Sequence, residues 1–250
     1  MTSREALDRA YAALDPYSRR HHWEWKSNLV HLETVSKHIE KGATIFDAGC
    51  GIGILALALT LLGYQVKGGD KYVFLPDNDF SLDYEKLRDI WERYGLTIMN
   101  TDVLTDAGSK QYDAVVSVAT IEHQKHPRQF LQRLIDMTRR GGHVYIATPN
   151  TAHLLNRIRF LFGYSPMAAH WDNYFKKGDA FEGHWREYTL AELVSMFTHL
   201  DLEVITAKNL QGLPTRWKKN FRNWYVNAIR LMSHLVRGAR ETNIILGKKR

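Results

Sequence analysis

The stretch FDAGCGIGILALAL, residues 46–59, joins a short apolar run to a long one through three glycines at alternate positions. The first run predicts a buried strand and the second a buried helix. A loop between such elements turns backbone N–H groups and the start of a helix toward a ligand. Glycine is needed there because a Cβ atom would hold the ligand away from the backbone. The stretch therefore predicts a site for a nucleotide-like ligand.

The spacing of these glycines differs from the dinucleotide fingerprint. That fingerprint has the pattern G-x-G-x-x-G, whereas Gly49, Gly51 and Gly53 follow G-x-G-x-G and are succeeded by Ile54. Asp47 lies two residues before the first glycine, where its carboxylate would repel a pyrophosphate. The same carboxylate suits a cationic group, such as the ammonium of an amino acid. The loop therefore disfavours a dehydrogenase and favours an aminoacyl nucleoside.

Five motifs in a fixed order make the chain resemble a known family. "FDAGCGIG" (46–53) is similar to the first motif, D/E-x-G-x-G-x-G, of the class I (Rossmann-like) S-adenosylmethionine-dependent methyltransferases. Later segments resemble the branch that includes the quinone-biosynthesis and the sugar and small-molecule O-methyltransferases. These segments are "MNTDVLTD" (99–106), "YDAVVSVATIEH" (112–123), "RRGGHVYIATPN" (139–150) and "GHWREYTLAELVSMF" (183–197). The resemblance covers about residues 43–206 and the last predicted strand.

The resemblance implies S-adenosyl-L-methionine as the cofactor, with S-adenosyl-L-homocysteine as its product. It places Asp70 at the ribose hydroxyls and Asp102 near the adenine amino group, with Val103 beside the ring. Acids at strand ends agree with this, because ligands of open α/β sheets bind at the carboxyl edge. The expected cofactor-binding residues are Asp47, Gly49, Cys50, Gly51, Gly53, Asp70, Lys71, Asp102, Val103 and Ser117.

Strands and helices alternate after an N-terminal helical region, which predicts a parallel sheet with crossover helices. The resemblance implies an α/β fold with a Rossmann-like, mostly parallel seven-stranded sheet, helices on both faces and an antiparallel last strand. Strands are expected at 43–48, 65–69, 96–100, 113–118, 143–150, 202–206 and 242–247, and helices at 53–62, 82–94, 127–140 and from 189. We expect a single domain made of an N-terminal helical region (1–42), a cofactor-binding core (43–150), an aromatic-rich substrate cover (151–188) and a basic amphipathic helical insertion (208–240).

The chemistry is expected just after the fourth strand. In a methyl transfer the cofactor carries the reactive group, and a hydroxyl acceptor also benefits from a base that takes its proton. The candidates are Glu122, His123 and His184, with His123 as the general base and His126 nearby. Quinone enzymes and small-RNA 2′-O-methyltransferases of this family bind a divalent metal through an E-x-x-E-H motif here. Ala119 replaces the first Glu of that motif, and Mg²⁺ demands near-ideal octahedral geometry, so we expect no metal.

Residues 151–188 contain nine aromatic side chains without a clean period. We expect most of them to pack in the core. An insertion after the fifth strand lies over the carboxyl edge of the sheet, so others are expected to line an acceptor pocket, where they would suit a sugar or a quinone. These residues are Phe160, Phe162, Tyr164, Trp171, Tyr174, Phe175, Phe181, Trp185 and Tyr188.

The net charge of +7 belongs to one segment, because residues 204–240 contain eight basic and no acidic residues. Within it an apolar stripe recurs at three- and four-residue intervals, which predicts an amphipathic helix. Such a stripe can pack on the sheet or on a second subunit of a homodimer, or it can lie in a membrane interface. The excess of cations favours an anionic partner, whether a membrane, a lipid-linked substrate or nucleic acid, and our hypothesis is that the segment binds anionic lipid surfaces. The stripe consists of Trp217, Phe221, Trp224, Ala228, Leu231 and Leu235.

The composition, with 44% hydrophobic and 24% charged residues, is that of an ordinary globular protein. The first 16 residues lack the apolar region of a secretory signal, and one cysteine, Cys50, cannot form an internal disulfide. We therefore expect a cytoplasmic enzyme, peripheral at the inner face of a membrane, that methylates a small or glycan- or lipid-linked acceptor such as a sugar, glycolipid or phenol. Two alternatives stay open. One is an RNA methyltransferase, although no RNA-binding module is recognised and nucleic acid is not the expected partner. The other is a non-catalytic cofactor-binding protein.

Overall fold

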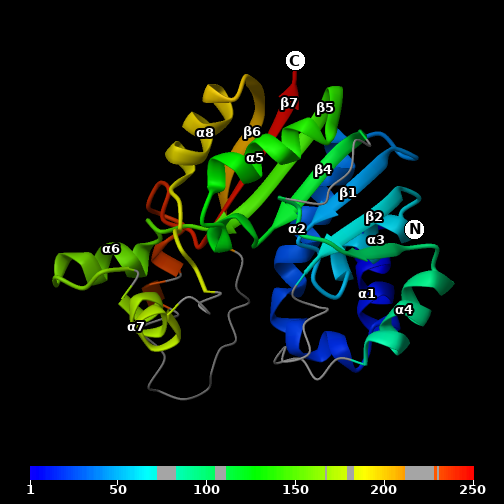
Figure 1. Cartoon of the computed structure of the whole chain (residues 1–250). Coiled ribbons are helices and arrows are strands. Elements are labelled where there is room, and N and C mark those ends of the chain that lie inside the picture. Colours follow the sequence, from blue (N-terminus) through cyan, green and yellow to red (C-terminus); the bar gives the residue numbers. More distant parts are fainter. Residues whose placement is uncertain (72–82, 105–110, 167, 179–182, 212–227, 230) are drawn as a thin grey trace.

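A computed structural model describes residues 1–71, 83–104, 111–166, 168–178, 183–211, 228–229 and 231–250 of the chain. Its centre is a seven-stranded sheet with the strand order β3-β2-β1-β4-β5-β7-β6 (Figure 1). The strands are β1 (Thr44–Ala48), β2 (Gln65–Asp70), β3 (Thr97–Asn100), β4 (Tyr112–Val118), β5 (Thr138–Pro149), β6 (Leu202–Leu210) and β7 (Thr242–Lys249). The pairs from β3 to β5 are parallel, and β7 is antiparallel to both β5 and β6. The expected Rossmann-like sheet with an antiparallel last strand is confirmed.

Helices cover both faces of this sheet. Side chains alternate between the faces, so Val115 and Val116 of β4 belong to two different hydrophobic cores. One core contains α1 to α4, and the other contains α5 and α8. The helical elements are α1 (Ser3–Ala13), η1 (Tyr17–Glu24), α2 (Trp25–His38), α3 (Ile54–Leu61), α4 (Tyr84–Arg93), η2 (Ile121–His123), α5 (Pro127–Asp136), α6 (Leu154–Leu161), α7 (Ala168–Lys177) and α8 (Leu190–His199).

The largest differences from the expected element boundaries lie at the junction of α5 and β5 and at the end of β6. The helix expected at 127–140 ends at Asp136, because Thr138 already pairs with β4 as the first residue of β5. The side-chain ammonium of Lys249 donates to the carbonyl oxygens of Ile135 and Thr138 and so holds this junction. Strand β6 runs beyond the expected residue 206 to Leu210, because β7 continues to pair with it.

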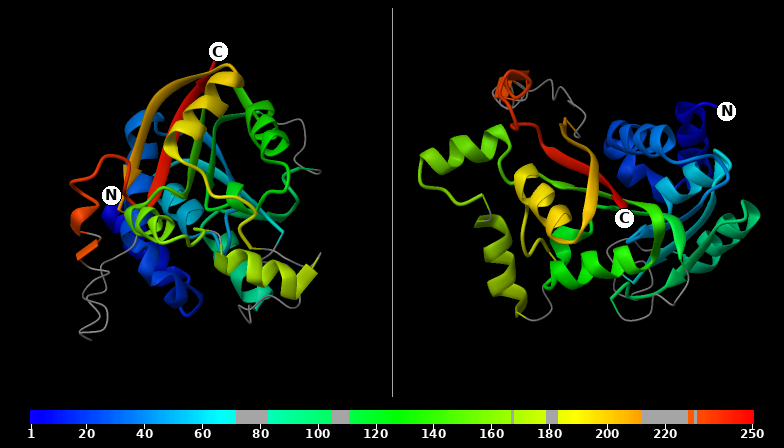
Figure 2. Two further views of the ribbon diagram at one scale, coloured as in Figure 1. Left: turned by 90° about the vertical axis from the view of Figure 1, so that its left-hand side faces the viewer. Right: turned by 90° about the horizontal axis from the view of Figure 1, so that it is seen from above.

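The expected substrate cover contains α6 and α7, which extend away from the sheet (Figures 1 and 2). The expectation that most of its aromatic side chains pack in the core is wrong. Phe160 is 68% exposed, Phe162 is 75% exposed and Trp171 is 54% exposed, whereas Tyr188 is buried. Phe181 lies outside the described residues. Because α6 and α7 extend away from the sheet, the side chains of Phe160, Phe162 and Trp171 stay exposed to solvent.

The basic insertion is described only in part, since Trp217, Phe221 and Trp224 lie outside the described residues. Leu231 is 72% exposed and Leu235 is 87% exposed, so these two members of the stripe do not pack on the sheet. The end of the insertion is held against α6, where the Arg157 guanidinium donates to the carbonyl oxygens of residues 237 and 238. Within the described part of the chain, no helix combines the length and the apolar character needed to span a membrane.

Candidate active site

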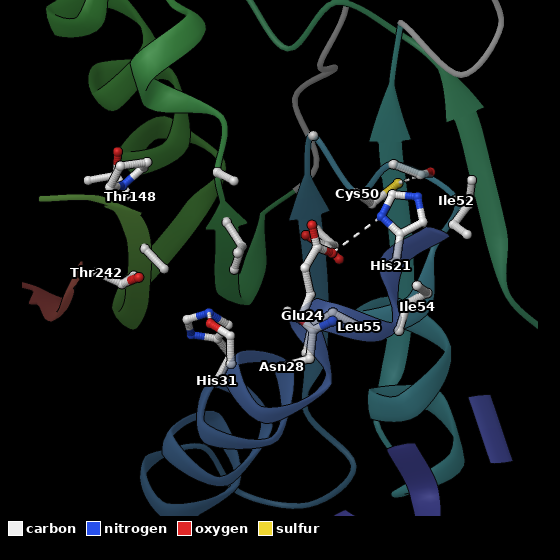
Figure 3. Close-up of a pocket in the computed structure, with 18 of the residues that line it drawn as sticks. His21, Glu24, Asn28, His31, Cys50, Ile52, Ile54, Leu55, Thr148 and Thr242 are labelled. Carbon is white, nitrogen blue, oxygen red and sulfur yellow. Dashed lines mark hydrogen bonds and ion pairs between the residues drawn. The ribbon is translucent and has the colours of Figure 1, made fainter. Parts of the chain in front are cut away.

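A cavity of about 520 Å³ lies at the carboxyl edge of the sheet (Figure 3). Its floor is the glycine loop together with the ends of β2, β4 and β5, and its remaining walls are the start of β7 and the N-terminal η1–α2 segment. Ligands of open α/β sheets bind at this edge, outside the strand ends. Five of the residues expected to bind the cofactor line this cavity, namely Asp47, Gly49, Cys50, Gly51 and Asp70.

A buried acid near the end of β1, just before the glycine loop, has a charge that is not compensated. Burial, together with the neighbouring charge of Asp70, raises the pKa of Asp47 to about 7. Its Oδ2 has no hydrogen-bond partner among the described residues. Asp70 accepts a hydrogen bond of 2.9 Å from the backbone N–H of Gly51, which fixes the loop to the end of β2. A buried carboxylate oxygen without a hydrogen-bond partner is unfavourable, and a cationic group of a ligand would supply the missing partner.

The other expected cofactor residues lie outside the lining of this cavity. Gly53 begins α3 with a φ of 82°, and a Cβ atom there would lie 2.5 Å from a side-chain carbon of Ile98. Ser117 is buried and donates a 2.8 Å hydrogen bond to the carbonyl of residue 48, which joins β4 to β1. Asp102 forms an ion pair of 3.0 Å with Lys71. Val103, the residue after Asp102, is buried.

The expected catalytic residues do come together. Glu122 is 1% exposed, and burial raises its pKa to about 7. The rings of His123 and His184 pack edge to face with their centroids 4.8 Å apart. Burial lowers the pKa of His184, but the 2.9 Å hydrogen bond to Glu187 and the charge of Glu122 outweigh it, so that this pKa is raised. The segment around His184, far along the chain, therefore completes the cluster.

This cluster lies behind the cavity wall and is not part of its lining. Thr148 connects the two, since it lines the cavity and its hydroxyl donates a 2.8 Å hydrogen bond to Glu122 Oε2. Glu122 Oε1 has no hydrogen-bond partner among the described residues. One ligand atom from each of Glu122, His123 and His184 lies within 4.8 Å of the others. One carboxylate and two imidazoles could hold a transition metal better than Mg²⁺, so the expected absence of a metal stays a prediction.

Sequence reasoning missed the N-terminal wall of the cavity, which contributes His21, Trp23, Glu24, Ser27, Asn28 and His31. His31 bonds through Nδ1 to the Tyr145 hydroxyl at 2.7 Å and through Nε2 to the Ser27 hydroxyl at 3.0 Å. Burial lowers the pKa of His31 to about 4, so its ring is neutral and anchors α2 to β5. No spacing in the first 40 residues indicates this role, because its partner lies 114 residues away.

Comparison with known proteins agrees with this architecture. The family model described as "Methyltransferase domain" matches residues 11–207. The mitochondrial ubiquinone biosynthesis O-methyltransferase of Dictyostelium discoideum is 29% identical over 60% of this chain and 52% of its own length. The ubiquinone biosynthesis O-methyltransferase of Dinoroseobacter shibae is 28% identical over 76% of this chain and 72% of its own length.

A solved structure shows the same fold. The 1,6-didemethyltoxoflavin-N1-methyltransferase of Burkholderia thailandensis, with S-adenosylhomocysteine bound, aligns with 98% of this chain and 86% of its own with a TM-score of 0.58 and 13% identity. This chain spans about half to two thirds of the length of several of the curated relatives that it matches. The family model nevertheless covers most of the present sequence, from α1 to β6. The chain therefore belongs to the methyltransferase domain family.

Proposed function

We propose that this chain uses S-adenosyl-L-methionine to methylate a hydroxyl group of a small, quinone-like phenolic acceptor. The observation that carries the proposal is the buried Asp47 carboxylate, with an unmade hydrogen bond, beside Asp70 and the glycine loop. The names of the relatives favour a phenol over the sugar or glycolipid that the sequence also admits. A base cluster behind Thr148 is consistent with a hydroxyl acceptor.

When bound, the cofactor supplies a methyl group on a positively charged sulfur. The carboxylate of Asp47 would hold its ammonium group and Asp70 would hold its ribose. Val118, Ala119 and Ala147 give part of the cavity an apolar lining, which would exclude water and strengthen the electrostatic interactions inside. We propose that His123 takes the acceptor proton, and that the neighbouring carboxylate of Glu122 stabilises the positive charge left on its ring. His184, held by Glu187, packs against the His123 ring and orients it.

The test combines binding and turnover. Calorimetry with S-adenosyl-L-homocysteine should show one site, and wild type should methylate catechol, used here as a simple phenolic probe. His123→Asn should lower kcat about 10²-fold or more, as expected for loss of a general base, without changing the affinity for S-adenosyl-L-homocysteine. Binding with no turnover of catechol, of larger phenols or of RNA would favour a non-catalytic protein. RNA methylation with a steep salt dependence would favour the RNA alternative.

We also propose that the protein associates with anionic membrane surfaces through the end of the basic insertion. Leu231, Leu235 and Val236 are exposed there, and Arg237 and Arg240 follow within a few residues. Exposed apolar side chains beside cations are the pattern of an interfacial segment. The neighbouring α6, held to this segment by Arg157, carries further exposed apolar side chains.

Vesicle flotation tests this surface. Wild type should float with phosphatidylglycerol vesicles at low salt, and a double variant with Leu231→Asp and Leu235→Asp should not, while its unfolding profile stays unchanged. Failure of wild type to float would contradict the proposal. A dimer in light scattering that the same double variant dissociates would assign the stripe to a second subunit instead.

A further inference from the structure

The cavity is rich in acids and has no compensating cation in its described lining. Four carboxylates line it, from Glu24, Asp47, Asp70 and Glu241, whereas no Lys or Arg does so within the described residues. Asp47 and Asp70 lie at the ends of β1 and β2, beside the glycine loop, where the proposed function already uses them. Glu24 comes from the N-terminal wall and has no role in that proposal.

The surroundings of Glu24 suit a carboxylate. Its Oε2 accepts a hydrogen bond of 3.3 Å from Nδ1 of His21, another residue of the cavity lining. It also lies at the junction of η1 and α2, where it is the N-cap residue of α2 and its side chain makes no capping hydrogen bond. Figure 3 shows His21 toward the Cys50 end of the cavity, Thr148 and Thr242 at the other end, and Glu24 between them.

The proposed donor and its product differ by one charge inside this cavity. The sulfonium of S-adenosyl-L-methionine is positive and the thioether of S-adenosyl-L-homocysteine is neutral, whereas their ammonium and carboxylate groups are the same. Glu24 lies between the two ends of the cavity (Figure 3), and a sphere of the same volume, about 520 Å³, would be about 10 Å across. We therefore take about 10 Å as the working separation between Glu24 and a sulfonium bound there. At an effective dielectric constant of about 20, an attraction over 10 Å corresponds to about a tenfold change in affinity.

We propose that Glu24, oriented by His21, makes the site prefer the positively charged methyl donor over its neutral product. This rests on the proposed function, since it needs S-adenosyl-L-methionine as the ligand. Loss of the positive charge on methyl transfer removes the attraction, so the site holds the product less tightly than the donor, which limits product inhibition. Glu24 is thus a specificity-determining residue of the cofactor site, supplied by a segment outside the glycine loop.

The experiment measures the affinities of both ligands by calorimetry in the absence of acceptor. In Glu24→Gln the dissociation constant for S-adenosyl-L-methionine should rise about tenfold, and that for S-adenosyl-L-homocysteine should change less than twofold. Glu33→Gln is the matched control, because Glu33 lies on the same helix α2, is exposed and is not part of the cavity lining. It should change neither constant. Glu24→Asp, which keeps the charge, should retain most of the preference.

Equal weakening of both ligands in Glu24→Gln would overturn the inference, since it would assign Glu24 a structural or hydrogen-bonding role. Unchanged affinity for both ligands would overturn it as well. Loss of the preference in Glu24→Asp to the same extent as in Glu24→Gln would show that charge is not the cause. If wild type binds neither ligand, the proposed function itself fails, which is a distinct result.

Discussion

Replacing Asp47 by asparagine should make the protein's stability less sensitive to pH. The pKa of this buried carboxyl is raised from 3.8 to about 7, so the unfolded chain releases the proton first. Between these two values the folded state binds more protons, and its free energy of unfolding therefore falls as the pH rises. A difference of one pKa unit between the two states is worth about 1.4 kcal/mol. Ionisation of Asp47 therefore lowers the free energy of unfolding of wild type by about 4 kcal/mol in total, and by about 3 kcal/mol between pH 5 and pH 8. An amide at this position cannot ionise, so the variant should escape this loss.

Urea unfolding of both proteins at pH 5 and pH 8, without ligand, measures the effect. Stability of Asp47→Asn relative to wild type should rise by about 3 kcal/mol from pH 5 to pH 8. The cost of burying the amide, about 1–3 kcal/mol, is the same at both pH values and cancels. Glu122 also titrates in this range, but it is common to both proteins. Asp89→Asn, at an exposed position, is the control. A relative stability that does not change with pH would refute the reasoning.

Three further predictions concern single contacts. Asp70→Ala should weaken S-adenosyl-L-homocysteine binding in calorimetry about 10- to 100-fold, because it removes a charged hydrogen-bond acceptor; an unchanged affinity would contradict the ribose role. Tyr145→Phe should lower the free energy of unfolding in urea by about 1–3 kcal/mol, since it leaves Nδ1 of buried His31 without this partner; no loss would mean that α2 is anchored otherwise. EDTA should leave methyl transfer to catechol unchanged, and a loss restored by Mg²⁺ or Mn²⁺ would assign a metal to the cluster around Glu122.

The sheet could be predicted from the sequence because each strand and its following loop form a local pattern. The glycine loop marks both the end of β1 and the start of α3. In the same way, Asp70 marks the end of β2 and Asp102 follows the end of β3. The carboxyl edge could therefore be located without any long-range contact. The order of motifs along the chain, matched to a family, supplied the antiparallel last strand, which local patterns alone do not specify.

Contacts between distant segments could not be predicted in the same way. His184 reaches His123 across 61 positions, and the cavity wall between His21 and His31 comes from a helical segment without a recognisable motif. The error over the aromatic residues of α6 and α7 has a related cause. Aromatic side chains without a period do not reveal which face is covered, and exposure depends on where a helix leaves the body of the protein.

The pairing of Leu210 with Thr242 has a consequence for how this molecule could be altered. The two residues are partners in adjacent antiparallel strands, so residues 211–241 begin and end at neighbouring points of the sheet. A short turn could bridge that gap, but Glu241 lines the cavity and the carbonyl oxygens of Gly238 and Arg240 accept hydrogen bonds from Asn150. Only the part of the insertion before residue 237 is therefore a candidate for exchange. Exchanging that part between related chains would test whether it directs the protein to a surface, while the glycine loop stays in place.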